Sequence, residues 1–305
     1  MNRITKVLLG AGAFLCMSGG LLALTGWAAG ADTQAMRGVG IHSHSGSERS
    51  YESAPDETGY VEDMDLEPFT KLDVDLSLGD VTIMTGDSYG VILDWHGRNY
   101  LLSYELDDDT LQVRSSQSVN WDLAGHSASV TVYLPEHTEL EEMDVHTSLG
   151  DAYLDDVCAR QLKASSDLGD VSLYDTTAGE LDVTCSMGDI WLDHVTAGSA
   201  ELTNSMGNIN AETLTTEQSL DVEASMGDID LRGDLCGETD IEASMGGIIL
   251  VLSQEEASYS YELDVSMGQL TVNDQTMPKR ASRTGGPHHL EIENHMGDIC
   301  VTFAY

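Results

Sequence analysis

The chain has 305 residues, with 53 acidic against 13 basic side chains and a formal net charge of −40 at pH 7. This charge argues against binding to nucleic acid, or to an anionic membrane surface, through a basic patch. The length allows a sizeable core, and the composition is typical of an exported, acidic, globular protein.

Residues 1–31 are predicted to form a membrane anchor or a signal segment. Arg3 and Lys6 precede an uncharged run at 7–29, which is long enough to span a bilayer. The positive flank places the N-terminus in the cytoplasm and the rest of the chain outside. We therefore expect a single-pass protein of the cell membrane with an extracytoplasmic C-terminal domain. The alternative is secretion after cleavage near the A-x-A sequence at Ala29–Ala31.

Two further segments precede the main repeats. Residues 32–59 are rich in Ser, Gly, His and Glu without periodicity, which predicts a flexible linker. Residues 60–142 are predicted to form a β-rich cap, because a solenoid would otherwise expose its sheet edges. The strand-like runs of this cap are 91–95, 100–106, 110–113 and 129–134.

A twelve-residue phrase, clearest as LDVTCSMGDIWL at Leu181–Leu192, occurs nine times. Its central glycines lie 19 or 20 residues apart from Gly150 to Gly246, and a fixed period near 20 indicates a solenoid. Alternating apolar residues indicate strands, and glycine can adopt the positive φ of a tight corner between them. The sequence therefore predicts an all-β, parallel solenoid over 143–305. The corner glycines are Gly79, Gly150, Gly169, Gly188, Gly207, Gly227, Gly246, Gly268 and Gly297.

The chain resembles the bacterial "putative adhesin" family of envelope-anchored β-solenoids. The resemblance is carried by YELDDDTLQV at Tyr104–Val113, SVTVYLP at Ser129–Pro135 and the S-x-G-D-I/V rungs that follow. It implies a right-handed β-solenoid and an extracytoplasmic address. It also implies an association with envelope-stress operons of Gram-positive bacteria, and it brings no catalytic residues.

A column of Leu and Met precedes the corner glycines. We expect it to face the core, because Met fills irregular interiors well. The alternative is a track for the soft ion Cu(I). The column consists of Leu78, Leu149, Leu168, Met187, Met206, Met226, Met245, Met267 and Met296.

Outward positions carry columns of carboxylates. Stacked coils would place like charges about 5 Å apart, at a cost of roughly 0.9 kcal/mol per neighbouring pair in water before screening. We favour a solvated face, in which the Asp after each glycine accepts local backbone N–H bonds. The alternative is weak Ca²⁺ binding between coils, with Asp170, Asp189 and Asp228 as candidate ligands; no other cofactor is expected.

Near the C-terminus, residues 273–289 interrupt the period and carry Lys279, Arg280 and Arg283. We interpret this segment as a surface loop from one coil, which is where repeat proteins accept insertions. The alternatives are a contact site or a protease target.

Signals for catalysis are weak. His146, His194 and His295 have no evident Ser or Cys partner. Tyr153 and Trp191 share an outward column, so stacking on sugar rings is an alternative to two isolated surface aromatics. Sparse cysteines without C-x-x-C spacing predict free thiols: Cys158, Cys185, Cys236 and Cys300.

The sequence therefore predicts a non-enzymatic, extracytoplasmic binding module. Its expected partners are the membrane, through the N-terminal helix, and a protein or glycan at the cell surface. The alternative is a polysaccharide-active enzyme, because such enzymes use β-helices and paired carboxylates are abundant here.

Overall fold

The computed structural model describes residues 58–97, 100–117 and 127–304, which belong to one compact unit, 46–305. The predicted membrane segment, and all but the last two residues of the predicted linker, lie outside the described residues. Within those described ranges no helix has the length and apolar character needed to cross a bilayer. They form strands joined by short turns, with one 3₁₀ turn, η2 (Glu256–Ser258).

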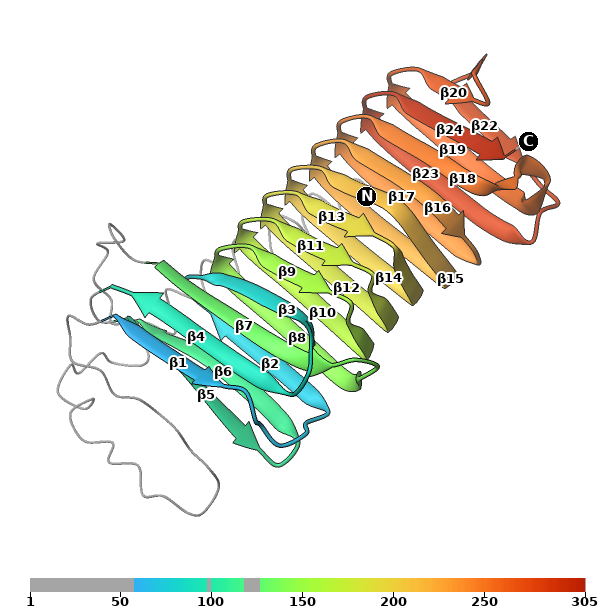
Figure 1. The fold of residues 1–305 in the computed structure, drawn as a ribbon. Coiled ribbons are helices and arrows are strands. Elements are labelled where there is room, and N and C mark those ends of the chain that lie inside the picture. The colour runs from blue at the N-terminus through green and yellow to red at the C-terminus, as the bar shows by residue number, and fades with distance from the viewer. Residues whose placement is uncertain (1–57, 98–99, 118–126, 305) are drawn as a thin grey trace, which may run out of the picture. The chain divides into compact units, whose positions relative to one another are not determined.

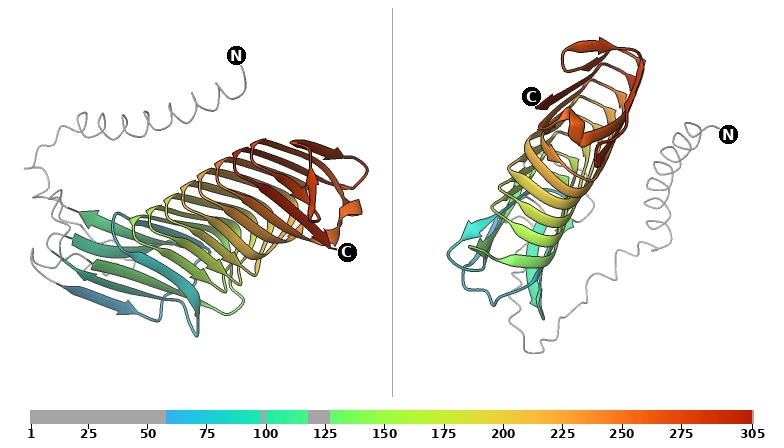
Figure 2. Two further views of the ribbon diagram at one scale, coloured as in Figure 1. Left: turned by 90° about the horizontal axis from the view of Figure 1, so that it is seen from above. Right: turned by 90° about the vertical axis from the view of Figure 1, so that its right-hand side faces the viewer.

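The strands stack into two parallel ladders, so that each coil contributes one strand to each ladder (Figures 1 and 2). In spatial order the first ladder contains β6 (Thr110–Gln117), β2 (Lys71–Leu76), β8 (Glu139–Leu149), β10 (Cys158–Leu168), β12 (Thr177–Met187), β14 (Val195–Met206), the end of β15 (Ile209–Met226), β17 (Glu238–Met245), β23 (His288–Met296) and β19 (Tyr259–Met267). The second ladder contains β7 (Ser127–Pro135), β3 (Asp80–Gly86), β9 (Ala152–Asp155), β11 (Val171–Tyr174), β13 (Ile190–Asp193), the start of β15, β16 (Ile229–Leu235), β18 (Ile248–Glu255), β24 (Ile299–Ala304) and β20 (Leu270–Val272).

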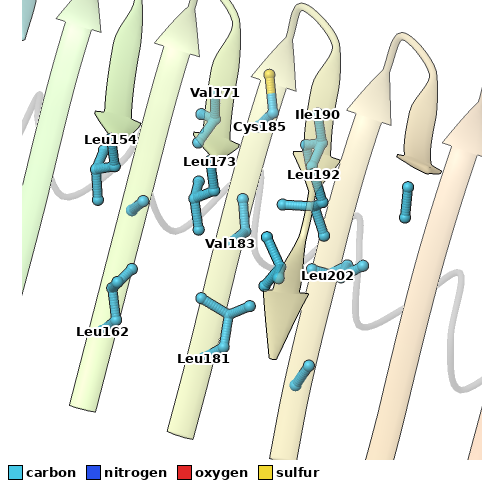
Figure 3. Close-up of a cluster of buried hydrophobic side chains, with 14 of the residues drawn as sticks. Leu154, Leu162, Val171, Leu173, Leu181, Val183, Cys185, Ile190, Leu192 and Leu202 are labelled. Atoms are coloured by element: carbon cyan, nitrogen blue, oxygen red, sulfur yellow. The ribbon is translucent and has the colours of Figure 1, made fainter. Parts of the chain in front are cut away.

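Parallel pairing of equivalent residues from coil to coil confirms the predicted all-β solenoid. Leu162 pairs with Leu181, which pairs with Ala200 in the next coil. Equivalent apolar side chains therefore stack inside the coils, as Figure 3 shows for Val171 and Ile190. The right-handed sense of the coil stays a prediction.

Antiparallel strands cover both ends. At the N-terminal end, β4 (Gly90–His96) pairs with β7 and with β1 (Gly59–Asp63), while β5 (Tyr100–Asp107) pairs with β6. At the other end, β21 (Gln275–Met277) pairs with β20, and β22 (Arg280–Arg283) pairs with β19. The interpretation of 273–289 as a surface loop was wrong for 275–277 and 280–283, because these residues form the two edge strands.

The spatial order of the coils differs from their order in the chain at both ends. The β2–β3 coil, the first copy of the phrase, lies between the β6–β7 coil and the β8–β9 coil. The β23–β24 coil, the last copy, lies between the β17–β18 coil and the β19–β20 coil. The first and last coils of the chain are thus each paired on both sides.

Candidate interaction surface

The corner between the two ladders requires glycine on two grounds. All nine corner glycines have φ between 128° and 154°, where residues with a side chain are strained. A Cβ at Gly188 would also lie 2.2 Å from the carbonyl oxygen of Gly169 in the preceding coil. Adjacent coils therefore approach each other closely at their corner backbones.

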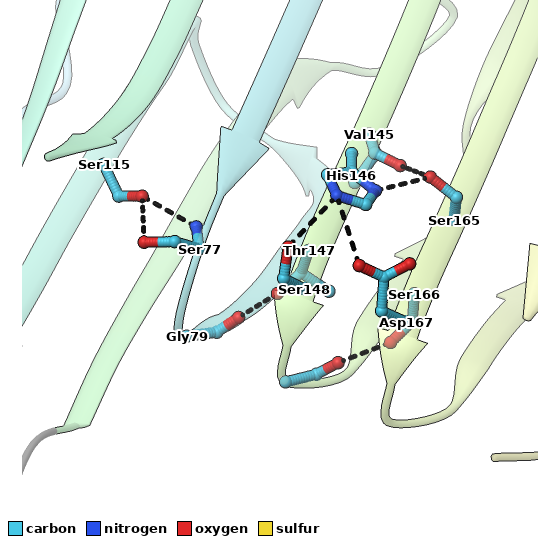
Figure 4. Close-up of polar contacts among 11 residues, drawn as sticks. Ser77, Gly79, Ser115, Val145, His146, Thr147, Ser148, Ser165, Ser166 and Asp167 are labelled. Atoms are coloured by element: carbon cyan, nitrogen blue, oxygen red, sulfur yellow. Dashed lines mark hydrogen bonds and ion pairs between the residues drawn. The ribbon is translucent and has the colours of Figure 1, made fainter. Parts of the chain in front are cut away.

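Buried polar side chains form hydrogen bonds between adjacent coils on the inner side of this corner. Three residues before the glycine, the side chain donates to the carbonyl oxygen of the corner glycine one coil back. Thr147 donates to the Gly79 carbonyl at 2.9 Å, as Figure 4 shows, and Ser166 donates to that of Gly150 at 3.0 Å. Cys185, Asn204 and Asn294 make the same bond in their own coils. This column explains most of the buried polar residues near the corner.

The residue after the corner glycine, an Asp in six of the nine coils, forms hydrogen bonds between coils on the outer side of the corner. Asp170 Oδ1 accepts the backbone N–H of Asp189 at 2.8 Å, and Asp189 Oδ1 accepts that of Asn208 at 2.7 Å. We call this column the aspartate ladder; its acceptors are Asp80, Asp151, Asp170, Asp189, Asn208, Asp228 and Asp298. The expected bonds to local N–H groups are instead bonds between coils.

These bonds bear on the proposed calcium ligands. One carboxylate oxygen of Asp170, Asp189 and Asp228 is already engaged by a backbone N–H. Among the described residues, no three or more His, Cys, Asp or Glu side chains are grouped to hold a metal ion. Calcium binding by these residues stays a prediction, and the aspartate ladder gives them a structural role without a cation.

The Met column points outward. Leu168 and six methionines are 39–58% exposed: Met187, Met206, Met226, Met245, Met267 and Met296. The expectation of core packing was wrong for these residues. Cys185 is the last inward residue of β12, and the chain turns at Gly188 before a further inward position is reached. Alternation within a strand therefore does not extend through the corner.

Eight carboxylates form two adjacent columns over four successive coils. We call them the acidic array: Asp221, Glu223, Asp240, Glu242, Glu291, Glu293, Glu262 and Asp264. Partial burial raises the pKa of Asp240 from 3.8 to about 6, with further contributions from Glu291 and Glu242. Partial burial also raises the pKa of Asp221 and of Glu223. At its outer end, Arg280 forms a 2.7 Å ion pair with Asp264.

Two shallow grooves lie along this face. One, of about 490 Å³, includes Lys163, Asp182 and Glu201 in its lining; the other, of about 440 Å³, includes Glu262 and Arg280. Every lining residue lies on a strand. The grooves therefore lie between the side chains of neighbouring strands.

His146 has serine partners that the sequence analysis missed. Its Nδ1 lies 3.0 Å from Ser165 Oγ, and its Nε2 lies 3.3 Å from Ser148 Oγ (Figure 4). The Asp167 carboxylate is 4.0 Å from Nε2, which is beyond hydrogen-bond distance for orienting a catalytic base. Ser165 follows His146 by 19 residues, the period of one coil, so the repeat spacing was the signal that could have identified it.

The aromatic column is as predicted. Tyr153 and Trp191 lie on either side of Ser172 in register, and they are 37% and 41% exposed. The Tyr174 ring lies 5.3 Å from that of Tyr153. Sugar stacking on this patch stays a prediction. The four cysteines in the described ranges are free thiols.

The fold and its surface define a parallel β-solenoid. Hydrogen bonds between coils hold its corners, and its outward side chains repeat in columns from coil to coil. The Toastrack family, DUF4097, matches residues 69–302, and the chain belongs to this family. No curated protein matches the chain.

Solved structures similar to the chain include the following three bacterial proteins. One is a "putative cell adhesion protein" from Clostridium sporogenes, with 14% identity over 81% of this chain and 100% of that one, at a TM-score of 0.26. A "putative adhesin" from Bacteroides fragilis has 16% identity over 81% and 97%, at a TM-score of 0.38. Another from Parabacteroides merdae has 10% identity over 82% and 97%, also at 0.38.

Proposed function

We propose that this protein is a non-enzymatic binding module of the cell envelope, in which the stacked coils present a repeated acidic surface to a positively charged partner. The observation that carries the proposal is the acidic array. Its carboxylates are held in register on paired strands, at the spacing of adjacent coils.

The array has a cost in stability that binding would offset. Its two columns contain six neighbouring pairs of like charge along the ladder. At roughly 0.9 kcal/mol per pair in water, the repulsion reaches about 5 kcal/mol before salt screening. Such a load is large against the marginal stability of a typical domain. A partner that brings cations to the array would relieve it, and would gain from a steered approach.

The alternative, a polysaccharide-active enzyme, has less support. Such an enzyme would require a groove that holds a distinct set of polar groups beneath covering loops. The grooves described above are lined by strand residues alone. The residues around His146 have the types needed for nucleophilic catalysis but lack a base held by a carboxylate at bonding distance.

The cellular setting belongs to the proposal. The uncharged run at 7–29 would anchor the chain in the cell membrane by a single pass, with the solenoid on the extracytoplasmic side. Cleavage after this run would instead release the same module. In either case the acidic surface would meet partners outside the cytoplasm.

Binding to a poly-L-lysine-coated biosensor tests the proposal. The test variant is Glu223→Gln/Asp240→Asn/Glu242→Gln/Glu293→Gln. The control removes the same number of charges from exposed sites outside the array: Asp87→Asn/Glu105→Gln/Glu136→Gln/Glu141→Gln. We expect the array variant to bind at least tenfold more weakly than the control variant. Equal losses in the two variants would show that only net charge matters, and the proposal would fail.

A further inference from the structure

We propose that the six exposed methionines form a binding site for the soft metal ion Cu(I). We call this column the methionine ladder; in spatial order it consists of Met187, Met206, Met226, Met245, Met296 and Met267. The site is separate from the acidic array and does not depend on the proposed function.

Register places the thioethers next to one another. Met187 pairs with Met206, Met206 with Met226, and Met226 with Met245. The Gly246 N–H donates to the Met296 carbonyl, and Met296 pairs with Met267. Neighbouring backbones in a sheet lie about 4.8 Å apart. Met has three rotatable side-chain bonds, so sulfur atoms from adjacent coils can converge on one ion.

The fold does not account for methionine at these positions. Each side chain is 39–58% exposed, so the ladder does not fill the core. The corner accepts leucine equally well, since Leu168 takes the same position in β10 with 42% of its surface exposed. Six adjacent coils nevertheless carry methionine. The property that distinguishes Met from Leu here is the thioether, a soft ligand that selects Cu(I) over hard cations.

The surroundings favour a cation. The aspartate ladder lies two residues along the chain from the methionines, so that Asp189, Asp228 and Asp298 follow Met187, Met226 and Met296 across the corner. Their charge raises the local concentration of a monovalent cation. The exposed His295 precedes Met296, and imidazole is a further ligand that suits copper.

The experiment follows the methionine methyl groups of the full-length chain by NMR after ¹³C-methyl labelling. Ag(I) serves as a redox-stable probe of the Cu(I) site, and Cu(I) is then tested without oxygen. The cysteines, including Cys16, are changed to Ser so that thiols do not compete. Cys185→Ser should be tolerated, because Ser166 makes the equivalent bond in its own coil. The buried Met143 is the internal control.

We expect stoichiometric Ag(I) to shift the ladder methyl signals and to leave the Met143 signal unchanged. The variant Met206→Leu/Met226→Leu/Met245→Leu keeps the apolar surface, since Leu168 shows that the corner holds leucine. It should bind Ag(I) at least tenfold more weakly while retaining the melting temperature of its parent. The inference is overturned if the ladder signals stay in place, or if the leucine variant binds Ag(I) as well as its parent. The latter outcome would leave the ladder as an apolar docking face.

Discussion

The aspartate ladder is interrupted at one position, and repairing it should stabilise the protein. Gly247 follows the corner glycine of the β17–β18 coil, where most coils carry Asp. Its N–H donates to Asp228 Oδ1 at 2.7 Å, but it has no side chain to accept the N–H of Asp298 in the next coil. In the β14–β15 coil, Asn208 fills the equivalent position and accepts the N–H of Asp228 at 3.0 Å. The substitution Gly247→Asn would supply the missing acceptor.

The expected gain in the free energy of unfolding has two parts, and a Gly247→Ala control separates them. Gly247 is absent from the glycines with positive φ, and the nearest atom to an added Cβ would be Asp228 Oδ1 at 3.6 Å. Gly247→Ala should therefore stabilise by about 0.4–1 kcal/mol, because it restricts the unfolded chain. Gly247→Asn should add about 0.5–1.5 kcal/mol for the new hydrogen bond. Asparagine adds no charge between Asp228 and Asp298.

Urea unfolding of the wild type and both variants measures these differences. The expected order of midpoints is asparagine above alanine above wild type, with similar slopes for the three proteins. If the asparagine variant is no more stable than the alanine variant, then bonds between coils along this column do not contribute to stability. The structural role assigned to the aspartate ladder would then be refuted.

Three further predictions concern the corner backbone, the inner column of polar side chains and the acidic array. Gly188→Ala should lower the free energy of unfolding by more than the roughly 1–3 kcal/mol expected for Gly285→Ala. Both residues have positive φ, but only the first would meet a neighbouring carbonyl; equal losses in urea titrations would contradict the steric argument. Ala224→Ser should stabilise by about 1 kcal/mol in the same assay, by donating to the corner carbonyl one coil back, and no gain would contradict the role of the inner column. The raised pKa of Asp240, about 6 against 3.8, means that its protonation stabilises the folded state. This stabilisation is complete below about pH 4 and is lost as the pH rises through 6. The melting temperature of the Asp240→Asn variant should therefore depend less on pH between these two values than that of the wild type. If the melting temperature of the Asp240→Asn variant depends on pH as steeply as that of an Asp274→Asn control, this prediction is wrong.

Local geometry explains which features the sequence predicts. Inward and outward positions alternate along β12 as the sequence indicates, because successive side chains of a strand lie on opposite faces. The corner glycines are evident because a positive φ together with a close backbone approach excludes other residues. Met187 was misplaced because a two-residue period holds only up to the corner. The contact of His146 with Ser165 follows from the repeat period, since residues 19 apart lie side by side in adjacent coils.

The order of the coils could not be predicted from the sequence, because the nine copies share one pattern of apolar and glycine positions. The irregular spacings nevertheless mark where the order changes: 71 residues from Gly79 to Gly150, and 29 from Gly268 to Gly297. The first interval supplies an end coil and antiparallel edge strands, and the second supplies the antiparallel strands that pair with the other end coil. An end coil exposes unpaired backbone groups, which edge strands cover.

The first and last coils of the phrase lie one position inward from the ends of the solenoid. This placement pairs each of them on both sides, so that neither forms a fraying end. The segment at 273–289 is therefore the connection that this arrangement requires, since the chain must pass over its own outermost coil to reach the position of β23.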